Sequence, residues 1–186
     1  MTAHTAMDRV ITGLARVNGA VSVWARNLAA LLLMAMTAIV LLQVFFRYVM
    51  NDSLGWTEEV AKMMMVWSAF LVAPWAYRMG SNVAIDMFAA ALPGRTRLVL
   101  ETGLTLLVLW VVAMFFAESL AFWQRGLAIT AATVPVRMAW VYTVVPFGFA
   151  ALFLVGCELL LRTVMTLVNP RGDYTVPGAG VIREGE

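Results

Sequence analysis

Residues 27–46 read NLAALLLMAMTAIVLLQVFF and residues 138–157 read MAWVYTVVPFGFAALFLVGC, and neither stretch contains a charged residue. A bilayer core is about 30 Å thick and a helix rises about 1.5 Å per residue, so roughly 20 apolar residues cross it. Two more long apolar runs lie between these stretches. The sequence therefore predicts an all-α membrane protein with four transmembrane helices, at about 27–47, 57–78, 98–123 and 138–161.

The composition supports a membrane protein and argues against most membrane enzymes. Hydrophobic residues make up 62% of the 186-residue chain and charged residues 13%, against roughly 45–50% and 25% in soluble domains. Cys157 and His4 are the only residues of their kinds. An internal disulfide is therefore impossible, and a bis-histidine haem or a His-ligated zinc is not expected. We expect no cofactor, no metal, no catalytic residue and no nucleic-acid partner.

The segment before the first span has its own helical pattern. Its arginines lie off a stripe of apolar residues with helical spacing, which are Val10, Leu14, Val17, Val21 and Trp24. Such a pattern predicts an amphipathic helix that lies in the lipid headgroup region. Residues 1–26 are therefore expected to form an N-terminal tail with this interfacial helix, residues 27–165 the four-helix membrane domain, and residues 166–186 a disordered tail.

The distribution of basic residues predicts the orientation of the chain. Nine of the thirteen lie in the N-terminal segment, the central loop and the C-terminal tail, and the other four are Arg47, Lys62, Arg125 and Arg137. Short cytoplasmic loops of membrane proteins carry the excess of basic residues. Both termini and the central loop are therefore expected in the cytoplasm.

Two adjacent acids, Glu58 and Glu59, open the second span and allow two interpretations. In the first, Thr57 caps the helix and the carboxylates favour its dipole without any further role. In the second, Arg47 at the end of the first span pairs with Glu58 or Glu59 across the short Asn51–Gly55 turn. The residues alone leave both interpretations open.

Two further acids, Glu118 and Glu158, belong to the third and fourth spans and are predicted near the ends of these helices. Glu158 and Arg162 are four residues apart, which allows an ion pair on one helix face. Because neither acid is predicted near the bilayer centre, a structural role is favoured for both. The sequence therefore offers no midplane acid to bind a proton or a sodium ion, which weighs against a self-sufficient pump.

Residues 43–62, QVFFRYVMNDSLGWTEEVAK, resemble the signature of the small membrane subunit (DctQ-type) of the tripartite ATP-independent periplasmic (TRAP) transporters. A second match is YRMGSNVAID, residues 77–86. The two motifs point to structural or partner-interface residues, namely Phe46, Arg47, Tyr48, Asn51, Trp56, Glu58, Glu59, Arg78 and Asp86.

The resemblance implies partners rather than a substrate site in this chain. In such systems a large permease subunit (DctM-type) is similar to an elevator transporter and holds the substrate and sodium sites. A periplasmic substrate-binding protein (DctP-type) delivers the substrate. The resemblance thus implies a scaffold subunit, surrounded by membrane lipids, of a sodium-coupled symporter for organic anions in the bacterial inner membrane.

The alternative from a different functional class is a stand-alone four-helix transporter or channel that acts as a homo-oligomer. It would need a polar or ionisable pathway through the membrane. Gln43, Glu118 and Glu158 are few and peripheral in the predicted spans, so this alternative is not favoured.

Overall fold

The computed structural model describes residues 2–52, 54–80 and 94–168, and these residues form helices almost throughout. The elements are α1 (Thr2–Phe45), its π-helical continuation η1 (Phe46–Met50), α2 (Gly55–Gly80), α4 (Gly94–Gly126), α5 (Met138–Tyr142) and α6 (Val144–Val168). Four stretches are long and apolar enough to cross a membrane: Ile11–Met50, Gly55–Met79, Val99–Gly126 and Met138–Thr166. The prediction of an all-α protein with four membrane-spanning helices is confirmed.

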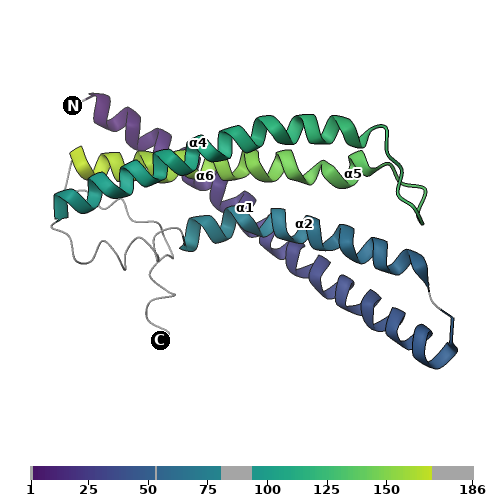
Figure 1. The fold of residues 1–186 in the computed structure, drawn as a ribbon. Coiled ribbons are helices and arrows are strands. Elements are labelled where there is room, and N and C mark those ends of the chain that lie inside the picture. The colour runs from purple at the N-terminus through teal and green to yellow at the C-terminus, as the bar shows by residue number, and fades with distance from the viewer. Residues whose placement is uncertain (1, 53, 81–93, 169–186) are drawn as a thin grey trace.

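The helices form two antiparallel hairpins, one of α1 and α2 and the other of α4 with α5 and α6 (Figure 1). Helix α6 joins the two hairpins, since it contacts α1, α2, α4 and α5. Helix α1 runs obliquely to α4 and α6 (Figure 1). Of the predicted tail, residues 166–168 still belong to α6, and the remainder lies outside the described residues.

The N-terminal amphipathic segment differs from the prediction because no break separates it from the first span. Helix α1 is continuous for 44 residues, and it contains no proline to interrupt it. Its small and polar side chains Asn18, Ser22 and Ala29 are buried, whereas Trp24 of the predicted apolar stripe is 78% exposed. In membranes, small and polar residues pack between helices and large apolar ones face lipid. The predicted apolar stripe therefore stays exposed, about a quarter turn around the helix from the inner face, which also contains the buried Ile11.

Aromatic contacts set the register between the two antiparallel rods of the second hairpin. Phe115 of α4 stacks on Phe149 of α6 with ring centroids 5.6 Å apart. Phe122 packs on Tyr142 of α5 with ring centroids 4.2 Å apart. The two contacts are seven residues apart on α4 and also seven residues apart on the α5–α6 side, so the antiparallel helices keep the same register between them. Residue 118 of α4 consequently lies level with residue 146 of α6.

Two glycines allow close approach where helices meet. A Cβ atom on Gly148 of α6 would lie 2.8 Å from the Phe70 ring of α2. A Cβ atom on Gly126, the last residue of α4, would lie 2.9 Å from the backbone nitrogen of Ala139 in α5. Both separations are shorter than van der Waals contact, so these positions require the absence of a side chain.

Candidate functional site

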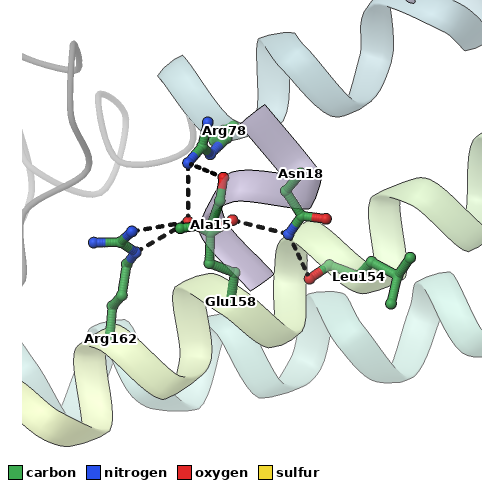
Figure 2. Close-up of polar contacts among 6 residues, drawn as sticks. All are labelled: Ala15, Asn18, Arg78, Leu154, Glu158 and Arg162. Atoms are coloured by element: carbon green, nitrogen blue, oxygen red, sulfur yellow. Dashed lines mark hydrogen bonds and ion pairs between the residues drawn. The ribbon is translucent and has the colours of Figure 1, made fainter. Parts of the chain in front are cut away.

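The most buried charged group of the described chain is the carboxylate of Glu158, which has no solvent exposure. It lies where α1, α2 and α6 meet (Figure 2). Its Oε1 atom accepts a hydrogen bond from Nη2 of Arg78 at 3.1 Å. The same oxygen lies 3.0 Å from Nη2 and 3.1 Å from Nε of Arg162, one helical turn further along α6. The ion pair between Glu158 and Arg162 that the sequence suggested is confirmed.

The second oxygen of Glu158 is held by the first helix. Asn18 of α1 donates from Nδ2 to Oε2 at 2.8 Å and to the Leu154 carbonyl at 3.2 Å. Arg78 in turn donates from Nη2 to the Ala15 carbonyl of α1 at 3.3 Å. We refer to Asn18, Arg78, Glu158 and Arg162 as the charge cluster. It connects three helices through side chains up to 140 residues apart in sequence.

A glycine makes room for the arginine of α2 in this cluster. A Cβ atom on Gly19 would lie 3.3 Å from Nη1 of Arg78. The Arg78 side chain is only 9% exposed, and its Nε atom is buried without a hydrogen-bond partner. Two guanidinium groups share one carboxylate, so the charge cluster carries a net positive charge. Buried charges are retained only with good geometry and several hydrogen bonds, and Glu158 has both.

The charge cluster also marks a level in the membrane. Trp140, near the opposite end of the fourth span, is 71% exposed, as is usual for a tryptophan at the membrane–water interface. Nearby, Trp123 donates from Nε1 to the Thr143 hydroxyl at 3.0 Å. Glu158 lies 18 residues beyond Trp140, which is about 27 Å along a helix. That distance is close to the ~30 Å thickness of a bilayer core, so the charge cluster lies near one interface and the tryptophans near the other.

At the tryptophan end, Arg47 attracts Glu58 electrostatically but forms no direct salt bridge with it. Glu58 pairs instead with Lys62, one turn along α2, at 2.7 Å. The Arg47 guanidinium lies over the Tyr48 ring, 6.0 Å from its centroid. Within the described ranges, no salt bridge joins Arg47 to either glutamate. The i,i+4 position of Lys62 holds Glu58 within its own helix, which the loop-crossing interpretation overlooked.

Glu59 binds the loop that connects α4 to α5. Its Oε1 atom accepts a hydrogen bond from the Ala132 amide at 2.9 Å, and its Oε2 atom accepts one from the Thr133 amide at 2.7 Å. Oε2 also accepts a bond from the Thr133 hydroxyl. Glu59 therefore joins the first hairpin to the second at the tryptophan end, a contact between segments more than 70 residues apart.

The structure contradicts the N-cap role of Thr57, although Glu58 does lie in the first turn of α2 as the capping interpretation expected. Helix α2 begins at Gly55, so Thr57 lies within the first turn rather than before it. Its hydroxyl donates to the Leu54 carbonyl at 2.5 Å, whereas an N-cap side chain would accept from a backbone N–H. Thr57 is fully buried and closes the turn between the first two spans.

The remaining residues suggested by the motifs do not gather at one place. Tyr48 is 77% exposed and Trp56 43% exposed at the tryptophan end, where Asn51 adopts a left-handed conformation with φ 53° and ends η1. Phe46 begins the same π-helical turn. Arg78 alone lies in the charge cluster, and Asp86 lies outside the described residues.

Asn18 and the central role of Glu158 were not predicted from the sequence. The signal available was a polar residue off the apolar stripe of the amphipathic helix, on a face with the small residues Ser22 and Ala29. In the described residues, no group of three His, Cys, Asp or Glu side chains is placed to hold a metal ion. The charge cluster connects α1, α2 and α6 through one shared carboxylate.

Comparison with known proteins gives two matches. A family model described as "Tripartite ATP-independent periplasmic transporters, DctQ component" matches residues 36–166. The chain is also similar to the sialic acid TRAP transporter small permease protein SiaQ of Vibrio cholerae, with 26% identity over 117 residues, or 63% of this chain and 68% of that protein. The family match includes Arg78, Glu158 and Arg162, whereas Asn18 precedes it.

Proposed function

Because this chain belongs to the family of DctQ components of the tripartite ATP-independent periplasmic transporters, we propose that it braces the large permease subunit of such a transporter. The chain is a small permease subunit and a multi-pass protein of the bacterial inner membrane. In this role the chain would serve a transporter that couples the uptake of organic anions to sodium.

A scaffold role is supported by the buried charged side chains, which are already paired with groups of this chain. Arg78 and Glu158 are the two charged side chains that are buried in the described residues, and they bind each other and α1. Four donor atoms already engage the two Glu158 oxygens. This carboxylate is buried and already paired with two guanidinium groups, which disfavours its use by a substrate or a coupling cation, and no other acid is buried in the described residues.

The partners and the substrate follow from the family. A large permease subunit would hold the substrate and sodium sites, and a periplasmic binding protein would deliver the substrate. The name of the Vibrio cholerae relative ties that protein to sialic acid, so sialic acid is the first organic anion to test here.

Reconstitution in liposomes with a sodium gradient tests this proposal. We expect no uptake of labelled sialic acid, or of a panel of other organic anions, by the purified chain alone. We expect uptake of at least one of them when the large subunit and the binding protein are added, and loss of that uptake when this chain is left out. Flux through the chain alone would overturn the scaffold role in favour of a stand-alone homo-oligomeric transporter.

We also propose that both termini face the cytoplasm. The start of α1 and the end of α6 lie at the same end of the bundle (Figure 1), and nine of the thirteen basic residues flank that end in the sequence. A reporter that is active only in the cytoplasm, fused after residue 90 or residue 175, should be active at both positions. A periplasmic signal from either fusion would refute this orientation.

A further inference from the structure

The structure places Glu118 deeper in the membrane than the sequence indicated. The register of the second hairpin puts Glu118 level with Pro146, between the two aromatic contacts. Trp140 lies six residues from Pro146 toward one interface, about 9 Å, and Glu158 lies twelve residues away toward the other, about 18 Å. Glu118 is therefore well inside the hydrocarbon region, close to its middle third. Glu118 lies eight residues before the end of α4 at Gly126, farther from the helix end than the predicted span of 98–123 placed it.

The Glu118 side chain is also on the outer face of the bundle. It is exposed, whereas the side chains of α4 that face α6, such as Leu109 and Ser119, are buried. Among the residues that the structure describes, none forms a hydrogen bond or ion pair with its carboxyl group. Lipid chains offer no hydrogen-bond donor, and ionisable residues at this depth almost always face another protein segment or a water-filled cavity.

The neighbours of Glu118 form a continuous exposed stripe on α4. Leu107 is 54% exposed, Trp110 61% and Met114 53%, and Arg125 is exposed at the interface end. These side chains follow one another at spacings of three, four and seven residues, which keeps them on one helix face. This is the spacing with which one helix packs along another. A large aromatic side chain beside a polar group is also typical of the centre of a protein interface.

We propose that this α4 face, defined by Leu107, Trp110, Met114, Glu118 and Arg125, is the surface that docks on the large permease subunit. The large subunit would present an arginine, a lysine or another hydrogen-bond donor to Glu118. This inference rests on the proposed function, because it names the surface through which the scaffold binds its partner. A second copy of this chain fits less well, since a two-fold axis through this face would bring Glu118 toward its own equivalent. Two carboxylates at that position would repel each other.

Site-specific photo-cross-linking in the assembled complex tests the position of this surface. A benzoylphenylalanine placed at Met114 or Trp110 of the full chain, co-expressed with the large subunit, should form an adduct with the large subunit. The same probe at Leu109, which is buried against Gly156 of α6, is the matched control on α4 and should form adducts only within the chain. Adducts at Met114 that join two copies of this chain, or none at all, would overturn the proposal.

Substitution of Glu118 separates docking from folding. Glu118→Leu should lower the amount of large subunit that co-purifies by about tenfold or more, because the donor of the partner is left unpaired. The isolated chain should be at least as resistant to heat as the wild type, since leucine is better solvated by lipid. Glu118→Asp should retain part of the assembly. Normal assembly of Glu118→Leu would refute the docking surface while leaving the proposed function intact. Failure of the wild-type chain to bind the large subunit would refute both.

Discussion

Glu158→Ala is expected to destabilise the folded subunit by about 3–5 kcal/mol, because it leaves Arg78 and Arg162 in a buried position without their shared carboxylate. The two arginine side chains are 9% and 11% exposed, so water cannot replace the lost partner without disrupting the helices. Asn18 would lose its acceptor on α6 as well. The measurement is the midpoint of thermal unfolding of the purified chain in detergent, followed by size-exclusion chromatography.

Two further variants show whether charge or shape is responsible for this loss. Glu158→Gln keeps the shape, and its single carbonyl oxygen can accept from the arginines or from Asn18 but not from both, so its loss should be smaller than that of the alanine variant but not zero. Glu58→Ala removes an exposed carboxylate whose pair with Lys62 lies on the surface of α2, and exposed pairs contribute little. It should therefore unfold at the wild-type temperature. An unfolding midpoint of Glu158→Ala equal to that of the wild type would show that the charge cluster does not hold the helices together.

Gly126→Ala is expected to destabilise the chain by about 1–3 kcal/mol, which is the usual cost of forcing an extra methyl group into a packed site. The new Cβ atom would lie 2.6 Å from Cδ2 of Tyr142, 2.9 Å from the nitrogen of Ala139 and 3.0 Å from its Cα atom. Two of these three atoms belong to the backbone, so a rotamer change cannot relieve the clash. The end of α4 must instead move away from α5, which weakens the Phe122–Tyr142 contact.

Gly103→Ala is the matched control on the same helix. A Cβ atom at Gly103 would meet nothing within 4 Å, and alanine is preferred to glycine inside a helix by up to about 1 kcal/mol. This variant should therefore be as stable as the wild type or slightly more so in the same thermal assay. Equal unfolding midpoints for Gly126→Ala and Gly103→Ala would contradict the close packing of α4 on α5.

The sequence predicted the parts of this structure that depend on one helix at a time. The length of the apolar runs identified four spans, and the four-residue spacing of Glu158 and Arg162 identified their ion pair. The contacts that join different helices could not be predicted in this way. Arg78 is 80 residues from Glu158, and the spacing of residues along one helix does not reveal which helices are neighbours.

Two features could not be predicted from the sequence for the same physical reason. The apolar stripe that contains Trp24 was predicted to face lipid on a separate interfacial helix, and it stays exposed in the structure, but on a helix that continues into the first span. The residues of that helix that face the protein interior, such as Asn18, depend on where the other helices pack. The depth of Glu118 likewise depends on the stagger of α4 against α6, which the aromatic contacts of Phe115 and Phe122 determine.

The length of α1 has a mechanical consequence. Asn18, at the level of the charge cluster, and Arg47, at the other end of the first span, are 29 residues apart, or about 44 Å along a helix. The membrane levels that they reach are separated by only about 30 Å, so α1 must lean strongly, in agreement with its oblique course in Figure 1. The excess length becomes sideways reach of roughly 30 Å. In the proposed scaffold role, a large permease subunit that moves during transport would push sideways on this subunit. The lateral width given by the tilted α1 increases the contact with lipid on the side away from the partner, and this contact opposes tilting of the subunit relative to the membrane normal.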